Sequence, residues 1–278
     1  EDTSCYNCLR NYSNQRYHDD LQRGYAIKLM KYLLEMASKK LTVGADRFLA
    51  LEWANYAYEL FISMGDQATV RDSLRMYLED QIEGKESSRK TAIQLNRLWL
   101  TSEDSCDSLR KMTLSFPNTP SIMPSPIFHL GLAINIFPIY KQCVLVVGTL
   151  AKIMDSVTNK AIVDRVMERF PSPTSIPRAV GRVLQTLKDW GFIDLLQNRV
   201  TIKEIHVVDP DLVNWYILAL LKANSQSEIT LQELENCPFK LGVNFLHLRK
   251  AINQSSDLFL SRSYQGYEVI RRKQMTLE

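Results

Sequence analysis

The feature of this sequence that most constrains its fold is an order of segments that occurs twice in the second half of the chain. In each copy, three segments with the apolar periodicity of α-helices precede two short alternating segments, the pattern of a β-hairpin. The predicted elements of the first copy are helices over 139–154, 160–170 and 176–191 and a hairpin over 192–208. Those of the second copy are helices over 209–224, 229–239 and 242–255 and a hairpin over 257–273. Three helices and a hairpin in this order are typical of the winged helix, so the sequence predicts two tandem winged-helix-like modules over 138–208 and 209–278.

The first half of the chain has a different organisation. Five helical segments predict a helical bundle over 1–116, with Gly65 and Gly84 as glycines that end helices. The segment PNTPSIMPSP (117–126) then holds four of the ten prolines and no charge. Such a segment favours a linker, which with the short helix after it occupies 117–137. The predicted fold class is therefore mainly α.

Composition favours a soluble protein in a reducing compartment. No apolar run reaches the roughly 18 residues that a membrane span needs, and the first residues lack a signal-peptide pattern. We therefore expect no membrane partner. Cys106, Cys143 and Cys237 are scattered and fit buried free thiols better than a disulfide framework, which indicates the cytoplasm.

The third helix of the first copy carries the candidate binding face. In IPRAVGRVLQTLKDWG, Arg178 and Arg182 are four residues apart and lie opposite the apolar stripe, on the face that would enter a DNA groove. Hydroxyls just before a helix commonly hold a phosphate, and basic residues on a wing reach the DNA backbone. The predicted buried stripe is Ile176, Val180, Val183, Leu184 and Leu187. The predicted DNA-contacting residues of this copy are Thr174, Ser175, Arg178, Arg182, Gln185, Lys188, Arg199 and Lys203.

Charge is concentrated in the same copy. Residues 138–208 contain ten Lys and Arg against six Asp and Glu, a net charge of +4, whereas the net charge is −1 over 1–137 and zero over 209–278. This distribution favours a DNA contact. The alternative interpretation is that Arg178 and Arg182 form an ordinary solvated helix face. Winged helices also serve as protein–protein adaptors.

The sequence contains no recognisable catalytic motif. It lacks a Gly-rich phosphate loop, H-E-x-x-H and G-x-S-x-G. The four histidines lie far apart, and none has a catalytic spacing to a cysteine or a carboxylate pair; they are His18, His129, His206 and His247. We therefore expect neither an enzyme nor a cofactor.

The opening residues contain half of a metal-binding pattern. Cys5 and Cys8 have good spacing for zinc, but a closed site needs four ligands and His18 is the nearest third candidate, so we expect no complete metal site. The stretch CYNCLRNYSNQRYHDDLQRGYAIKLMKYLL (5–34) resembles the C-terminal tail of helicase-like proteins of bacterial antiphage defence systems. The resemblance implies a four-cysteine metal module whose other ligands would precede Glu1.

A second resemblance covers residues 46–273 approximately. The segments GKESSRKTAIQLNRLWL, AVGRVLQTLKDWGFI and CPFKLGVNFLHLRKAI resemble the small DNA-binding A proteins (BrxA-like) of bacteriophage-exclusion (BREX) systems. The clearest matches are SRKT (88–91) and TLKDWG (186–191). This resemblance implies an all-helical, non-enzymatic protein with a helix-turn-helix core. It adds Arg89 and Lys90 as candidate phosphate contacts.

These observations lead to one expectation and two alternatives. The expectation is a non-catalytic accessory protein of an antiphage system that binds double-stranded DNA with low sequence specificity, beside other defence-system subunits. One alternative is an adaptor that docks onto a defence helicase or methyltransferase. The other is a winged-helix transcriptional regulator, which would need a dimer and a palindromic site.

Overall fold

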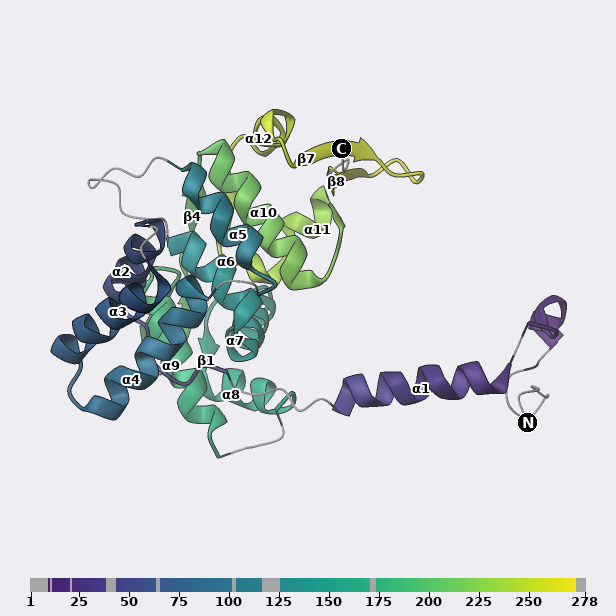
Figure 1. Ribbon diagram of the computed structural model, residues 1–278. Helices are drawn as coiled ribbons and strands as arrows, with labels where there is room; N and C mark the ends of the chain where they lie inside the picture. Colours follow the sequence, from purple (N-terminus) through teal and green to yellow (C-terminus); the bar gives the residue numbers. More distant parts are fainter. Residues whose placement is uncertain are drawn as a thin grey trace. The chain divides into compact units, whose positions relative to one another are not determined.

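The computed structural model places the chain in two units, Glu1–Leu41 and Thr42–Glu278, which are described separately (Figure 1). The residues described are 10, 12–20, 22–38, 44–63, 66–101, 104–116, 126–170 and 174–273. The first unit contains a 3₁₀ turn over Tyr12–Tyr17 and helix α1 over Arg23–Ser38. The predictions for Cys5, Cys8 and Gly65, and for the linker residues 117–125, lie outside the described residues.

The second unit begins with a set of short helices. Helix α3 starts where the Asp66 carboxylate accepts a hydrogen bond from the Thr69 amide, and Gly84, with φ of 95°, separates it from the next helix. The elements are α2 (Leu51–Ile62), α3 (Gln67–Gln81), α4 (Lys85–Leu95), a π-helical turn (Asn96–Leu100), α5 (Asp107–Met112), a 3₁₀ turn (Thr113–Ser115) and α6 (Pro126–Ile136).

One buried arginine closes the end of the π-helical turn. The guanidinium of Arg110 donates to the carbonyls of Arg97, Leu98 and Thr101 at 2.7–2.8 Å, and to both carboxylate oxygens of Asp104. All five of its N–H donors are therefore used. Because the last carbonyls of a helix lack partners within the helix, Arg110 satisfies groups that burial would otherwise leave unpaired.

The first copy of the repeated order follows. Its elements are α7 (Pro138–Leu150), β1 (Val157–Thr158), α8 (Asn159–Met167), α9 (Ile176–Asp189), β2 (Ile193–Leu196) and β3 (Arg199–Ile202). The strands form an antiparallel sheet in the order β1-β3-β2. Gln197 and Asn198 join β2 to β3 with φ of 46° and 62°, the positive values of a tight type I′ hairpin turn.

The second copy has the same order and the same sheet topology. Its elements are α10 (Pro210–Asn224), β5 (Glu228–Thr230), α11 (Leu231–Glu235), α12 (Leu248–Gln254), β7 (Leu258–Arg262) and β8 (Glu268–Arg272). The strand order is β5-β8-β7, antiparallel throughout. Thr230 and Glu233 form a capping box that starts α11. The repeat of order predicted from the sequence is therefore present in the structure.

A parallel strand pair joins the two copies. Strand β4 (Ile205–Val207), which follows the first hairpin, pairs with β6 (Val243–Phe245), which lies between α11 and α12 after a 3₁₀ turn (Pro238–Lys240). The sequence predicts a hairpin arm and a helix for these residues instead. The helix α12 begins later than predicted because β6 occupies its expected first turn and His247 is left-handed, with φ of 58°.

A continuous hydrophobic core underlies all of these elements. Helices α6 and α10 lie in the middle of the unit and are buried over most of their surface (Figure 1). The predicted apolar stripe of α9 is buried throughout, and Trp190 is only 2% exposed. The mainly α class is confirmed. In the described residues no single helix is long and apolar enough to cross a membrane; α6 and α7 pass such a test only as a pair bent by 112°.

Candidate nucleic-acid interface

Helix α9 presents a polar stripe to solvent. Arg178, Gln185 and Lys188 are exposed and Arg182 is half-buried, all on the side opposite the buried stripe. Arg182 Nη1 donates to Gln185 Oε1 at 2.9 Å, which holds these two side chains together along the helix. The four predicted residues of α9 therefore share one face, as their spacing requires.

In the described residues, the cations of this stripe form no ion pair with a carboxylate. In the part of the chain that the structure describes, Arg178 and Lys188 make no ion pair with Asp or Glu, and neither does Lys203 after β3. Arg178 also lies in the first turn of α9, where the helix dipole disfavours a positive charge. This position is unfavourable for helix stability but suits a side chain that contacts an anion.

The start of α9 leaves polar groups available. Ser175 occupies the N-cap position, yet its side chain makes no capping hydrogen bond, and both Thr174 and Ser175 are exposed. The first turn also contains Pro177, which has no N–H. The two hydroxyls and the dipole together form the kind of helix start at which phosphates bind.

The hairpin contributes two more exposed cations. Arg199 begins β3 and donates from Nη1 to Ser156 Oγ at 3.0 Å, so its side chain lies along β1. Lys203 follows β3, and its backbone N–H donates to the Phe192 carbonyl at 2.9 Å. Both side chains are exposed. The hairpin thus carries positive charge directly after α9 in the chain.

The C-terminal half of α9 contacts the segment that precedes α2. The Leu49 amide donates to Thr186 Oγ1 at 2.9 Å, and the Leu51 amide donates to Asp189 Oδ2 at 2.6 Å. A shallow hollow lies beside these contacts, lined by Phe48, Gln185, Lys188 and Asp189. A duplex would therefore reach the N-terminal half of α9 more readily than its end.

The additional candidates lie on a different helix. Arg89 and Lys90 are on α4, where both contact the Glu86 carboxylate, at 2.9 and 3.2 Å. Their hydrogen bonds lower the pKa of Glu86 to about 2, with Arg89 as the larger influence. One carboxylate thus offsets part of the charge of these two cations, unlike the cations of α9.

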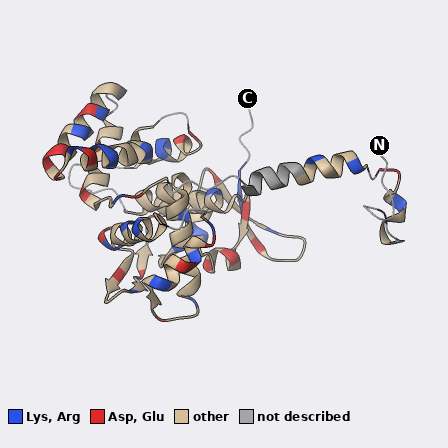
Figure 2. Cartoon of the chain, turned by 90° about the horizontal axis from the view of Figure 1, so that it is seen from below, with Lys and Arg blue, Asp and Glu red and all other residues tan. Residues whose placement is uncertain are grey.

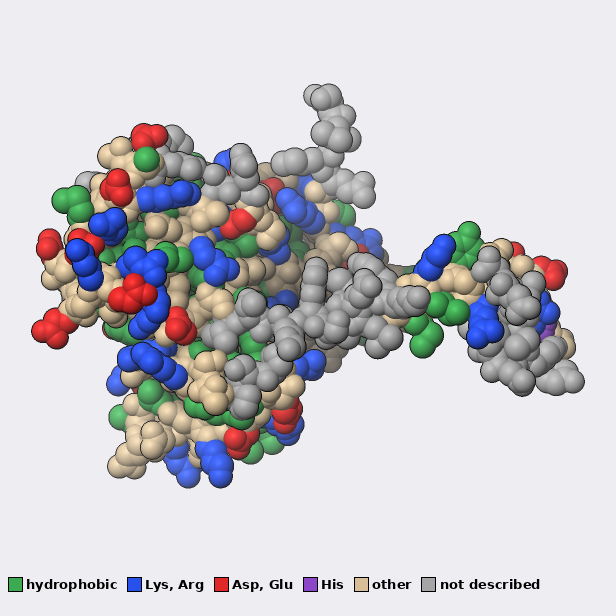
Figure 3. All heavy atoms as spheres, turned by 60° about the horizontal axis from the view of Figure 1, so that its bottom comes forward, with side chains coloured by type: hydrophobic (Ala, Val, Ile, Leu, Met, Phe, Trp, Pro, Cys, Tyr) green, Lys and Arg blue, Asp and Glu red, His purple; other side chains and the backbone are tan. Residues whose placement is uncertain are grey.

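The wider surface has mixed charge. Figure 2 shows Lys and Arg on most helices of the second unit, with Asp and Glu between them. Figure 3 turns the lower side of Figure 1 toward the viewer and again shows basic and acidic side chains interspersed. On the side shown in Figure 3, the basic side chains therefore do not form one large uniform patch.

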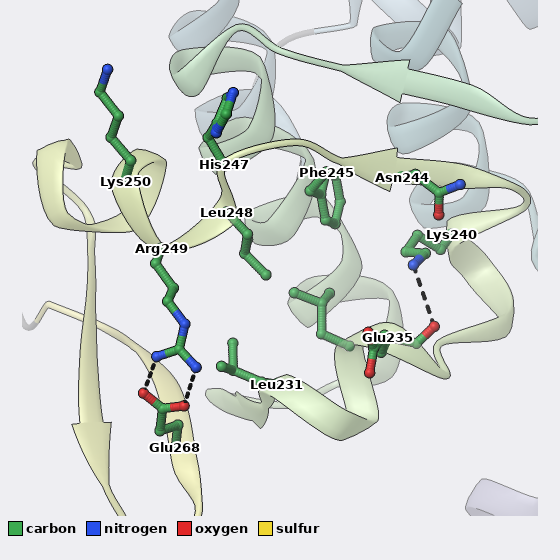
Figure 4. Close-up of a pocket in the computed structure, with 11 residues that line it drawn as sticks. Leu231, Glu235, Lys240, Asn244, Phe245, His247, Leu248, Arg249, Lys250 and Glu268 are labelled. Atoms are coloured by element: carbon green, nitrogen blue, oxygen red, sulfur yellow. Dashed lines mark hydrogen bonds and ion pairs between the residues drawn. The ribbon is translucent and has the colours of Figure 1, made fainter.

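The second copy contains an open hollow that the sequence did not reveal. Its volume is about 790 Å³, and apolar side chains from α11, β6 and α12 point into it (Figure 4). At one side, Arg249 forms a bidentate ion pair with Glu268 of β8. The apolar wall consists of Leu231, Leu234, Phe245 and Leu248. The sequence shows apolar residues around His247. It does not show that they line a cavity, because this depends on strand β6.

Groups with potential for chemistry are buried or isolated in the described residues. No cluster of three or more His, Cys, Asp or Glu there could hold a metal ion. Cys106, Cys143 and Cys237 are buried free thiols, as predicted, and burial raises the pKa of Cys106 and Cys143. Such thiols are poor nucleophiles.

Comparison of the chain with protein-family models, with characterised proteins and with solved structures gave no match in any of the three.

Proposed function

We propose that this protein binds double-stranded DNA without catalysis, with α9 as the recognition helix of a winged-helix module and β2–β3 as its wing. The observation that carries the proposal is the basic stripe on the third helix of the repeated order, with Arg178 and Lys188 exposed and Arg182 half-buried. A third helix in this position is the element that enters the major groove in helix-turn-helix proteins.

The sheet topology supports the winged-helix assignment. In the first copy, the short strand β1 before α8 pairs with β3, and β3 pairs with β2. The second copy repeats this with β5, β8 and β7. Two independent segments that adopt the same strand order are best explained by two copies of one module.

The binding mode would be mainly electrostatic. Arg178, Arg182, Lys188, Arg199 and Lys203 would neutralise phosphates, and each contact would add about one unit to the slope of log affinity against log salt. Because phosphate contacts carry no sequence information, sequence specificity would be low. The resemblance to BREX A proteins adds a proposed role as an accessory subunit of a cytoplasmic antiphage system.

Fluorescence anisotropy of a random-sequence duplex at several salt concentrations tests this proposal. We expect the wild type to bind at low salt, and we expect Arg178→Glu/Arg182→Glu to lose that binding while staying folded. The matched control is Arg71→Glu/Arg75→Glu, because these exposed arginines of α3 have the same four-residue spacing and change the net charge equally. A charge-reversed α9 that binds like the wild type, or an equal loss in the control, would exclude α9 as the contact.

The hollow of the second copy favours a second candidate function, docking onto a partner protein. Leu231, Phe245 and Leu248 of its apolar wall are partly accessible from solvent, as is typical of protein-binding grooves, whereas Leu234 is buried behind them. Phe245→Glu would weaken association with a partner subunit and leave DNA affinity unchanged. Loss of DNA affinity in this variant would count against two separate surfaces.

A further inference from the structure

The hairpin of the second copy ends in two exposed tyrosines. Tyr264 is fully exposed, at 108% of its reference area, and Tyr267 is 56% exposed. Both lie in the loop 263–267, which projects from the unit at the end of β7 and β8 (Figure 1). Tyrosine usually buries most of its ring, so two rings presented to solvent on one loop call for an explanation in terms of binding.

The loop that holds these rings is internally hydrogen-bonded. The Ser263 amide donates to the Tyr267 carbonyl at 2.8 Å, and the Gly266 amide donates to the Ser263 carbonyl at 2.9 Å. The Tyr267 amide donates to Ser263 Oγ at 3.1 Å. Gly266 has φ of 85°, which glycine adopts without strain. The rings are thus presented by an ordered turn, which lowers the entropic cost of binding through them.

The charge around the loop favours a polyanion. Residues 257–273 contain four Lys and Arg against two Asp and Glu. Glu268 is bound by Arg249, and Arg271 is bound by Glu228. In the described residues Arg262 and Arg272 form no ion pair, although Arg262 lies opposite Glu268 in the strand register and interacts with its charge. Both arginines are exposed cations on the strands that flank the tyrosine loop.

The two hairpins of the chain differ in the length of their loops and in the aromatic residues of those loops. The hairpin of the first copy closes through the two residues Gln197 and Asn198, which carry no aromatic ring. The hairpin of the second copy has a longer loop with two rings, and it lies well apart from α9 in Figure 1. The second hairpin is therefore a separate surface from the one that α9 presents to a duplex.

We propose that the β7–β8 hairpin binds single-stranded DNA, with Tyr264 and Tyr267 stacking on unpaired bases and Arg262 and Arg272 contacting the backbone. Aromatic rings beside cations are the usual means of binding unpaired strands, and stacking tolerates any sequence because every base has a π-face. This inference rests on the proposed function in that the ligand is DNA, and it adds a second site of different chemistry.

Anisotropy titrations with a labelled oligothymidylate and a blunt-ended duplex of equal length test the inference. Stacking contributes about 1–3 kcal/mol per base, so Tyr264→Ala/Tyr267→Ala, which removes two stacking rings, should weaken oligothymidylate binding by roughly thirtyfold or more. Duplex affinity should stay unchanged. Tyr264→Phe/Tyr267→Phe keeps the rings and should bind like the wild type. A 2-aminopurine placed in the oligonucleotide should be quenched by the wild type and the Phe variant, but not by the Ala variant.

Three results would overturn the stacking site: no binding of the oligothymidylate by the wild type, equal binding by the Ala variant, or equal losses in the Phe and Ala variants. The proposed duplex function fails in a different way. If the wild type does not bind the duplex, or if Arg178→Glu/Arg182→Glu binds it with normal affinity, the duplex function fails. In either case the dependence of single-strand binding on the tyrosines would remain.

Discussion

The carboxylate of Asp189, at the last residue of α9, accepts a hydrogen bond of 2.6 Å from the backbone amide of Leu51, the first residue of α2. The N-cap of α2 is Ala50, which has no side chain that could cap the helix. Asp189 on α9 therefore caps the start of α2, although the two residues in contact are 138 positions apart in the sequence. The contact fixes the end of the proposed recognition helix to the helical first half of the unit.

Loss of this cap should weaken the fold measurably. A capping carboxylate typically contributes about 1 kcal/mol, so Asp189→Ala should lower the free energy of unfolding by about that amount in urea titrations. Asp194→Ala is the matched control, because Asp194 is an exposed residue of β2 with no capping contact in the described chain. Equal stability of the two variants would show that the Asp189 contact does not contribute to the free energy of unfolding.

Arg178 should show opposite effects on stability and binding. Its positive charge in the first turn opposes the dipole of α9, so Arg178→Gln should raise the free energy of unfolding by about 0.3–1 kcal/mol. The same variant should weaken duplex affinity and reduce the salt slope by about one unit. Thermal unfolding and anisotropy on the same samples check both. A variant that loses stability would contradict the view that this arginine is placed for binding.

The junction between the two copies should depend on Gly242. Its φ is 79°, and a Cβ there would lie 2.1 Å from the Lys203 carbonyl oxygen. Gly242→Ala should therefore cost more than the roughly 1–2 kcal/mol of left-handed backbone strain, because β6 must move away from β4. Gly266→Ala is the control, since Gly266 has φ of 85° but a Cβ added there would meet nothing within 4 Å. Equal losses in urea titrations would show that contact with Lys203 is unimportant.

Trp190 should be a main contributor to the core. Its ring is 2% exposed and lies 5.5 Å from the His129 ring and 6.1 Å from the Tyr140 ring, measured between centroids. Trp190→Ala removes a large buried side chain at the end of α9, which typically costs about 3–5 kcal/mol. The melting temperature should fall strongly. An unchanged melting temperature would mean that the aromatic cluster repacks without loss.

Local patterns predicted much of this fold, and long-range pairing accounts for what they missed. The buried stripe of α9, the helix break at Gly84 and the repeated order of segments follow from spacing and residue type alone. The β4–β6 pair does not, because the pairing of Ile205 with Val243 depends on how the two copies dock. Without β6 the hollow of the second copy could not be foreseen.

The candidate site divides in the same way. The position of Arg178 and Arg182 on one face was predictable from helical periodicity. The contact of Asp189 with Leu51 was not, since no local signal links α9 to the start of α2. The ion pairing of Arg89 with Glu86 is a three-residue relationship on one helix, so helical spacing alone could have indicated that this cation is partly compensated.

His129 should make the fold sensitive to mild acid. Trp99 Nε1 donates to His129 Nδ1 at 3.0 Å, and because an indole N–H can only donate, the proton of the ring lies on Nε2, 2.8 Å from Asn55 Oδ1. Burial lowers the pKa of His129 to about 3 from its ordinary 6.5. Below pH 6.5 the unfolded chain therefore binds a proton that the folded chain does not. Stability from this residue is complete above that pH and falls by about 1.4 kcal/mol per unit as the pH drops toward 3.

Urea titrations between neutral pH and about pH 5 measure this slope. His129→Gln is the suitable comparison, because its amide can still accept from Trp99 and donate to Asn55 while it does not titrate. The variant should be less stable at neutral pH yet show a shallower loss on acidification. The pairing of Glu86 does not confuse the result, since its pKa of about 2 preserves its contribution at every pH above its ordinary 4.5. Identical slopes for wild type and variant would mean that His129 becomes protonated within the folded core.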